Sequence, residues 1–112
     1  MDNFRAESLG DRRQSPRLKC SVSVELRAEG EPTTWGKASD LSLGGCFVEM
    51  PIPLKQGSRF DILLWLSGTK LKLQACVASS APGFGIGVRF LEVAPPDQEL
   101  LSRFLQAAAK EG

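Results

Sequence analysis

Three arginines near the N-terminus, Arg12, Arg13 and Arg17, are the first residues whose chemistry suggests a function. The guanidinium group donates paired hydrogen bonds that match phosphate oxygens, and also the N7 and O6 acceptors of guanine. Pro16 disfavours a helical conformation at the residue before it, so the arginines are expected on an extended or turning arm. Taken alone, such a cluster is also typical of a solvated basic tail.

A second cluster follows about two dozen residues later and contains Asp40, Ser42, Gly44 and Gly45. A carboxylate accepts hydrogen bonds from the N1–H and N2–H₂ donors of guanine, and a glycine-rich turn lets backbone N–H groups approach an anion. The alternative is structural: the polar side chains cap a turn, and the glycines serve a bulge or a hairpin. Together, the two clusters predict a receptor for a guanine nucleotide with exposed phosphates.

Composition limits the other possibilities. The chain has 112 residues, enough for one domain, and a net charge of only +1, which argues against a general nucleic-acid binder. Neither an apolar run long enough to span a bilayer nor a secretory signal is recognisable, so we expect a cytoplasmic protein that does not insert into membranes.

Catalysis is not expected, because the chain lacks histidine and tyrosine and no serine or cysteine has a recognisable activating partner. The three cysteines, Cys20, Cys46 and Cys76, are odd in number and widely separated. Their spacing fits neither a disulfide framework nor a metal site, so we interpret them as free, buried thiols in a reducing compartment. No metal and no cofactor are predicted.

Alternating apolar and polar residues predict six short strands, at 19–27, 34–41, 46–50, 59–66, 71–77 and 84–90. In the last strand, Phe84 is expected on the inner face. Short strands joined by glycine and proline turns favour an all-β fold, a closed or nearly closed antiparallel barrel. After Pro95 and Pro96, apolar residues recur at helical spacing and predict one amphipathic helix over a barrel opening. Residues 1–18 are expected to form a flexible arm, and residues 19–112 the barrel with its helix.

These features resemble the PilZ domain, a bacterial receptor for the second messenger cyclic di-GMP. The family has an Arg-x-x-x-Arg motif in its N-terminal arm, matched by Arg13 and Arg17. Its second motif, Asp/Asn-x-Ser-x-x-Gly, is matched by Asp40, Ser42 and Gly45. The resemblance extends over about residues 11 to 109.

The resemblance implies that cyclic di-GMP is the ligand and that the arm becomes ordered around it, so that the signal passes to a partner protein. The free protein is expected to be a monomer. Arg13 and Arg17 would hold phosphates and a guanine Hoogsteen edge, and Asp40 and Ser42 would hold a guanine donor edge. The implied ligand-binding set is Arg12, Arg13, Arg17, Asp40, Ser42, Gly44, Gly45 and Gly87. In this set Arg12 is associated with binding of a stacked ligand dimer, whereas Gly87 is equally well explained as a glycine that helps to close the barrel.

Two other hypotheses remain open. A PilZ-like interaction module that binds no nucleotide could serve pilus assembly or another complex, although such members usually lack both motifs. An RNA-binding barrel would need exposed aromatic side chains on its strands, and Phe47 and Trp65 are the candidates.

Overall fold

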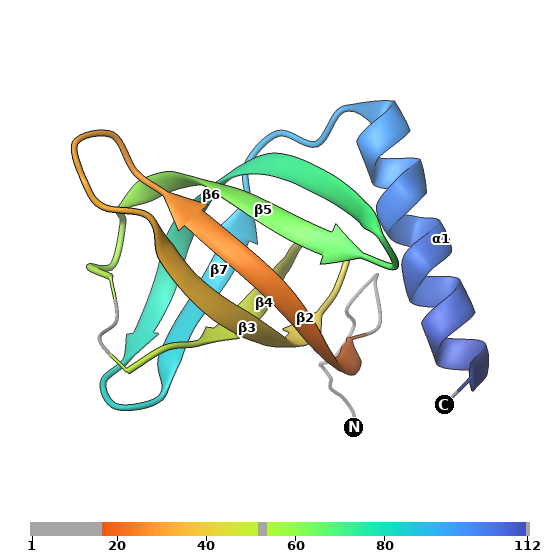
Figure 1. Cartoon of the computed structure of the whole chain (residues 1–112), viewed down its shortest axis with the longest axis horizontal. Helices are drawn as coiled ribbons and strands as arrows, with labels where there is room; N and C mark the ends of the chain where they lie inside the picture. The colour runs from red at the N-terminus through yellow and green to blue at the C-terminus, as the bar shows by residue number, and fades with distance from the viewer. Residues whose placement is uncertain (1–16, 52–53, 112) are drawn as a thin grey trace, which may run out of the picture.

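The structure is a closed, six-stranded antiparallel barrel with a helix across one end (Figure 1). The computed structural model describes residues 17–51 and 54–111. The elements in chain order are β2 (Leu18–Arg27), β3 (Thr34–Leu41), β4 (Gly45–Glu49), β5 (Arg59–Leu66), β6 (Thr69–Ala81), β7 (Gly85–Phe90) and α1 (Pro95–Glu111). In space the order is β2-β3-β4-β7-β6-β5, and β5 pairs with β2 to close the barrel. The predicted fold class is confirmed.

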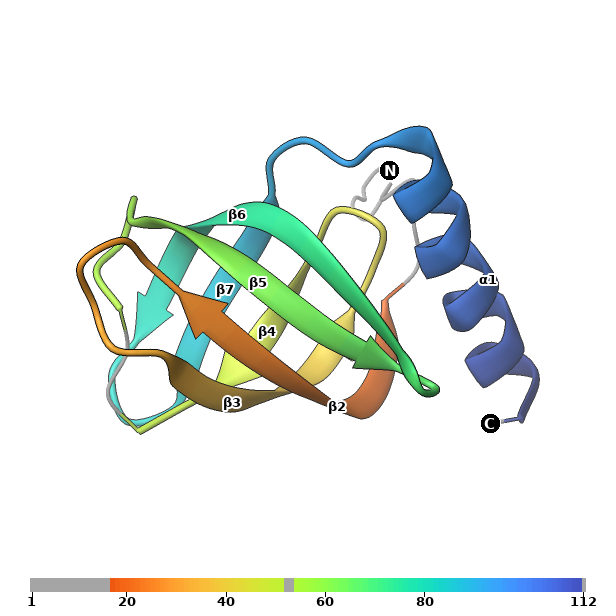
Figure 2. The same cartoon turned by 45° about the horizontal axis from the view of Figure 1, so that its top comes forward.

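The barrel is filled by the apolar side chains that alternate along its strands. Because successive side chains point to opposite faces, each strand contributes one row to the interior. The residues that are fully shielded from solvent include Val24, Leu41, Val48, Ile62, Leu64 and Ile86. Figure 2 shows that β3, β2 and β5 form one wall of the barrel, with β4 and β7 behind them.

The C-terminal helix packs on the barrel through Leu101, which is completely buried. Leu100, Phe104 and Leu105 are partly buried against the same core. These positions recur every three or four residues and therefore share one face of the helix. Within the described part of the chain, no helix combines the length and the apolar character that crossing a bilayer requires.

Two predicted boundaries are corrected. Strand β6 continues to Ala81 instead of ending at residue 77, and its register against β7 shifts between Val77 and Ser79. Phe84 was predicted to point inward, which is wrong, because its side chain is 73% exposed. Its backbone N–H donates to the carbonyl of Ala81 at 2.9 Å, so Phe84 belongs to the turn, and β7 begins at Gly85.

We expect Leu101→Ala to lower the free energy of unfolding by about 2–5 kcal/mol, because it removes a fully buried side chain and leaves a cavity under the helix. Urea denaturation measures this change. Leu100→Ala, at a half-buried position on the same turn, is the control and should lower the free energy of unfolding clearly less. Equal losses in the two variants would contradict this account of how α1 packs.

Candidate functional site

Asp40 faces outward because of an irregularity in β3. Ala38 and Leu41 are both completely buried, although three positions separate them and regular alternation would place them on opposite faces. The register against β4 shifts between Ala38 and Asp40, so that two residues of β3 oppose the single residue Phe47. Ser39 is thus the extra residue of a β-bulge, which reverses the alternation. As a result the carboxylate that would have pointed into the core lies on the outside of the barrel.

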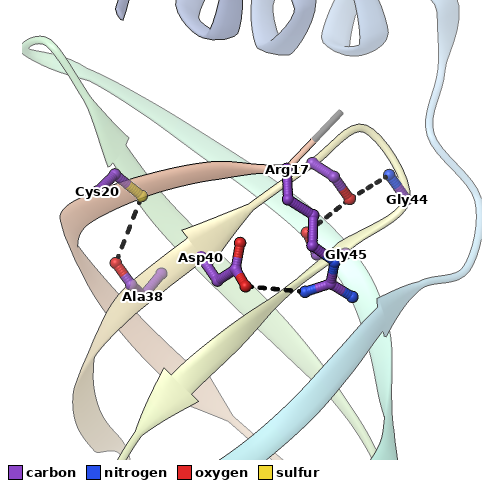
Figure 3. A network of polar contacts seen from close by, with 7 residues as sticks. Arg17, Cys20, Ala38, Asp40, Gly44 and Gly45 are labelled. Atoms are coloured by element: carbon purple, nitrogen blue, oxygen red, sulfur yellow. Dashed lines mark hydrogen bonds and ion pairs between the residues drawn. The ribbon is translucent and has the colours of Figure 1, made fainter. Parts of the chain in front are cut away.

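Arg17 and Asp40 form an ion pair at the start of β2 (Figure 3). Nη1 of Arg17 donates to Oδ2 of Asp40 at 3.1 Å. The Arg17 side chain is 50% exposed, whereas that of Asp40 is only 17% exposed. The second carboxylate oxygen, Oδ1, is buried and has no hydrogen-bond partner among the described residues. A buried acceptor without a partner is unfavourable by about 1–3 kcal/mol, so a hydrogen bond to Oδ1 would be stabilising for a donor that gains access to it.

The turn between β3 and β4 is held by its own hydrogen bonds. The Ser42 hydroxyl donates to the Gly45 carbonyl and accepts from the Gly44 N–H, each at 3.3 Å. The Ser42 backbone N–H also donates to the Gly45 carbonyl, at 2.9 Å. The turn-capping interpretation of this segment therefore describes the observed contacts of Ser42.

The two glycines of this turn differ in what surrounds them. A Cβ on Gly45 would lie 2.0 Å from the backbone oxygen of Val88, so this glycine lets β4 approach β7 closely. A Cβ on Gly44 would meet no atom within 4 Å. Gly44 thus leaves open space on the outer side of the turn, next to the Arg17–Asp40 pair (Figure 3).

A row of outward-facing residues runs across the strands from Asp40. In register, Lys19, Asp40, Phe47, Gly87 and Ser79 lie side by side on β2, β3, β4, β7 and β6. A second register shift, at Ala78, brings Ser79 into this row. A Cβ on Gly87 would lie too close to the hydroxyl oxygen of Ser79, so this glycine makes room for the Ser79 side chain that lies over it.

Two cysteines lie close to Asp40. The Cys20 thiol contacts the carbonyl of Ala38 at 3.6 Å (Figure 3), and Cys46 is buried beside it. Burial raises the pKa of Cys46 to about 12, and the charge of Asp40 adds to this effect. Burial, and then Asp40, also raise the pKa of Cys20. All three cysteines are free, so at neutral pH Cys20 and Cys46 are protonated thiols.

The predicted site residues fall into three groups. Arg17, Asp40, Ser42, Gly44 and Gly45 are brought together at one corner of the barrel. Gly87 lies two strands away from Asp40, in the same outward row.

Arg12 and Arg13 lie outside the described residues, as does most of the predicted arm. Lys19 and Ser79 were missed as neighbours of the site. Alternation predicts that Lys19 faces outward, but nothing in the sequence reveals the bulge that moves Ser79.

Comparison with known proteins places this geometry in context. A family model described as PilZ domain matches residues 11–107. No curated protein sequence matches significantly. Among solved structures, the chain is similar to Bacillus subtilis inhibitor of motility MotI/DgrA, with a TM-score of 0.75 and 17% identity over 89% of this chain and 52% of that one. It therefore spans about half the length of that protein.

Two isolated domains are also similar. The PilZ domain with c-di-GMP of YcgR from Escherichia coli gives a TM-score of 0.75 and 21% identity, over 89% of this chain and 93% of that one. The PilZ domain of CeSA from a cellulose-synthesizing bacterium gives a TM-score of 0.69 and 26% identity, over 85% of this chain and 99% of that one. Each of these two chains is covered almost completely, so the similarity includes the whole barrel.

The two neighbouring glycines allow a matched test. Gly45→Ala is expected to lower the free energy of unfolding by about 1–3 kcal/mol, because the new methyl group would collide with the backbone of Val88. Gly44→Ala should change it by no more than about 0.5 kcal/mol, since its Cβ enters open space. Thermal or urea denaturation compares the two. Equal stability of both variants would disprove the close approach of β4 and β7.

Thiol reactivity tests the burial of Cys46. Since its pKa is raised to about 12, almost no thiolate forms at mildly alkaline pH, and iodoacetamide should leave Cys46 unmodified in the folded protein. Mass spectrometry with and without urea measures the extent of alkylation. Half-buried Cys20 should be modified before Cys46. Alkylation of folded Cys46 at the rate seen in urea would contradict the structure.

Proposed function

The chain belongs to the PilZ domain family, and on this basis we propose that it is a receptor for cyclic di-GMP that binds the dinucleotide at the Arg17–Asp40 corner. The observation that carries the proposal is the buried Oδ1 of Asp40, which lacks a partner among the described residues. The similar PilZ domain of YcgR, described with c-di-GMP, supports the choice of ligand.

Asp40 accepts the donor edge of one guanine. The N1–H and N2–H₂ groups of guanine are adjacent donors, and a carboxylate presents two adjacent acceptors. In the described structure Oδ2 already accepts from Arg17, whereas Oδ1 is shielded from water. Since Oδ1 is closed to solvent in the described structure, a guanine reaches it when the groups that cover it move aside, and the hydrogen bond then satisfies an acceptor for which water competes poorly.

Arg17 binds the charged part of the ligand. Only one of its five N–H donors contacts Asp40, and half of its side chain is exposed to solvent. The remaining donors can hold phosphate oxygens or the N7 and O6 acceptors of a guanine, while the ion pair keeps the guanidinium close to the site.

The turn and the wall complete the binding surface. Ser42 acts by fixing the shape of the turn through its contacts with Gly44 and Gly45. Gly44 leaves room for the base and the sugar. A base lies against the barrel beside Phe47, where Gly87 and the Ser79 hydroxyl over it form the neighbouring surface.

The arm contributes Arg12 and Arg13, roles that rest on the family resemblance. In this proposal they hold phosphates and a Hoogsteen edge, and binding orders the arm on the barrel. The newly formed surface is then bound by another protein, in control of motility, attachment or exopolysaccharide production. We place the protein in the bacterial cytoplasm, as a monomer when no ligand is bound.

We expect Asp40→Ala and Arg17→Ala each to weaken cyclic di-GMP binding by at least about 2 kcal/mol, roughly thirtyfold, because each loses a charge-assisted hydrogen bond. Isothermal titration calorimetry gives both the affinity and the ligand-to-protein ratio. GTP and cyclic GMP serve as control ligands and should bind much more weakly.

Asp61→Asn is the matched control variant. Asp61 is also a carboxylate in an ion pair on the outside of the barrel, with Lys72 at 3.8 Å, but it lies on β5. Its replacement should leave the affinity unchanged. If the wild-type protein does not bind the dinucleotide, the receptor proposal fails and the interaction-module hypothesis is favoured.

A further inference from the structure

A pair of tryptophans lies on the outer face of the wall formed by β3, β2 and β5. Trp35 is on β3 and Trp65 on β5, and their ring centroids are 5.8 Å apart across β2. Trp35 is 61% exposed, although a large apolar side chain on a strand normally turns toward the core. They are the only two tryptophans in the chain. Trp65 was predicted as an exposed aromatic and is half-buried, whereas Trp35, the more exposed of the two, was not predicted.

The pair lies beside a row of outward-facing residues that crosses the wall. In register, Trp35, Glu25, Leu63 and Lys72 lie side by side on four strands. Glu25 and Leu63 are 5% and 2% exposed, although they point outward. Their burial means that larger neighbouring side chains lie over them, so this part of the wall is covered by side chains and not by solvent.

Positive side chains surround the tryptophans. Nζ of Lys70 lies 5.8 Å from the centre of the Trp65 ring, within range of a cation–π contact. Lys37 is exposed two residues after Trp35 on the same face of β3. Among the described residues, neither of these lysines has an ion-pair partner, whereas Arg27 pairs with Glu25 and Lys72 pairs with Asp61.

We propose that this surface, defined by Trp35, Trp65, Lys37 and Lys70, is a docking site for an acidic segment of a partner protein that carries an apolar anchor residue. Tryptophan is enriched among the residues that contribute most to protein interfaces, because it offers a large and rigid contact area. The anchor packs on Trp35, and carboxylates on either side of it pair with Lys37 and Lys70. The charge complementarity gives orientation and specificity more than affinity.

The distribution of charge favours an acidic peptide over a nucleic acid. A single-stranded nucleic acid needs a positive groove that follows its backbone. Here Glu49 lies opposite Lys37, and Glu25 and Asp61 neutralise two further cations on the same wall. Two separate lysines that form no ion pair among the described residues match two carboxylates better than a continuous polyanion.

The mode of binding is limited by the closed barrel. Every strand has two neighbours and both tryptophans lie on the outer face of the wall, so the partner binds mainly through side chains and not by adding a strand to an open sheet. The surface is already formed without any nucleotide, and its partner binding does not depend on the proposed receptor function. Either proposal can therefore fail without the other.

Tryptophan fluorescence and indole N–H resonances test the proposal directly, because both tryptophans lie in the surface. The probe is a synthetic peptide with a Leu-Phe centre between glutamate and aspartate residues. The comparison peptide has the same centre between lysine and arginine residues. We expect saturable binding of the acidic peptide, at least about tenfold tighter than that of the basic one.

Variants locate the binding. Trp35→Ala should weaken binding of the acidic peptide at least about fivefold, with Trp65 retained as the reporter. The double variant Lys37→Glu, Lys70→Glu should reverse the preference between the two peptides. Phe84→Ala is the matched control, since it removes an aromatic side chain that is even more exposed, from a different part of the barrel, and should have no effect on binding.

Several results would overturn the proposal. The first is that the acidic peptide does not bind, and the second is that the two peptides bind with equal affinity. The third is that Trp35→Ala and Phe84→Ala lower the affinity for the acidic peptide equally. Tighter binding of single-stranded oligothymidylate would identify a nucleic-acid surface instead. Concentration-dependent dimerisation that is lost in Trp35→Ala would identify a second copy of the chain as the occupant.

Discussion

The position of the candidate site depends on the packing of β3 around one extra residue. Ala38 and Leu41 must both enter the core, and the bulge at Ser39 is what permits this. The same bulge places Asp40 on the outer surface, where Arg17 can reach it. Burying an unpaired carboxylate inside an apolar barrel would be very unfavourable, so core packing and electrostatics favour the same backbone path. The packing of β3 that fills the core therefore also places Asp40 in the candidate site.

Much of the fold follows from the sequence because its physical cause is local. Alternation with period two identifies a strand with one buried face, and all six strands were predicted in this way. Bulges do not have such a signal, since they arise from the mutual fit of neighbouring strands. For this reason the extension of β6 beyond Val77 was not predicted, whereas Phe84 was placed wrongly because the turn before β7 is one residue longer than expected. Trp35 was missed for a related reason, because composition alone does not tell an exposed tryptophan from a buried one.

The candidate site was predictable as a set of residues but not as a geometry. The joint occurrence of the two motifs predicted that Arg17 and Asp40 act together, and in the structure Nη1 of Arg17 lies 3.1 Å from Oδ2 of Asp40. The unpartnered Oδ1 depends on packing around Asp40, which spacing cannot reveal. Similarly, the predicted role of Gly45 concerned the ligand, whereas its observed close approach is to the backbone of β7. One glycine can be required for the close packing of two strands and still border a binding surface.

The uninterrupted ring of strand pairing has a consequence for how this architecture diverges. Each strand is paired on both sides over at least part of its length, so no strand of the ring presents an edge that is free from end to end, which disfavours self-templated aggregation. Residues whose side chains point outward can then be substituted with little effect on the hydrogen bonds between the strands. This explains how chains that share only 17–26% of their residues retain the same barrel. The barrel therefore tolerates substitutions on its surface, and new binding specificities can arise while the fold stays the same.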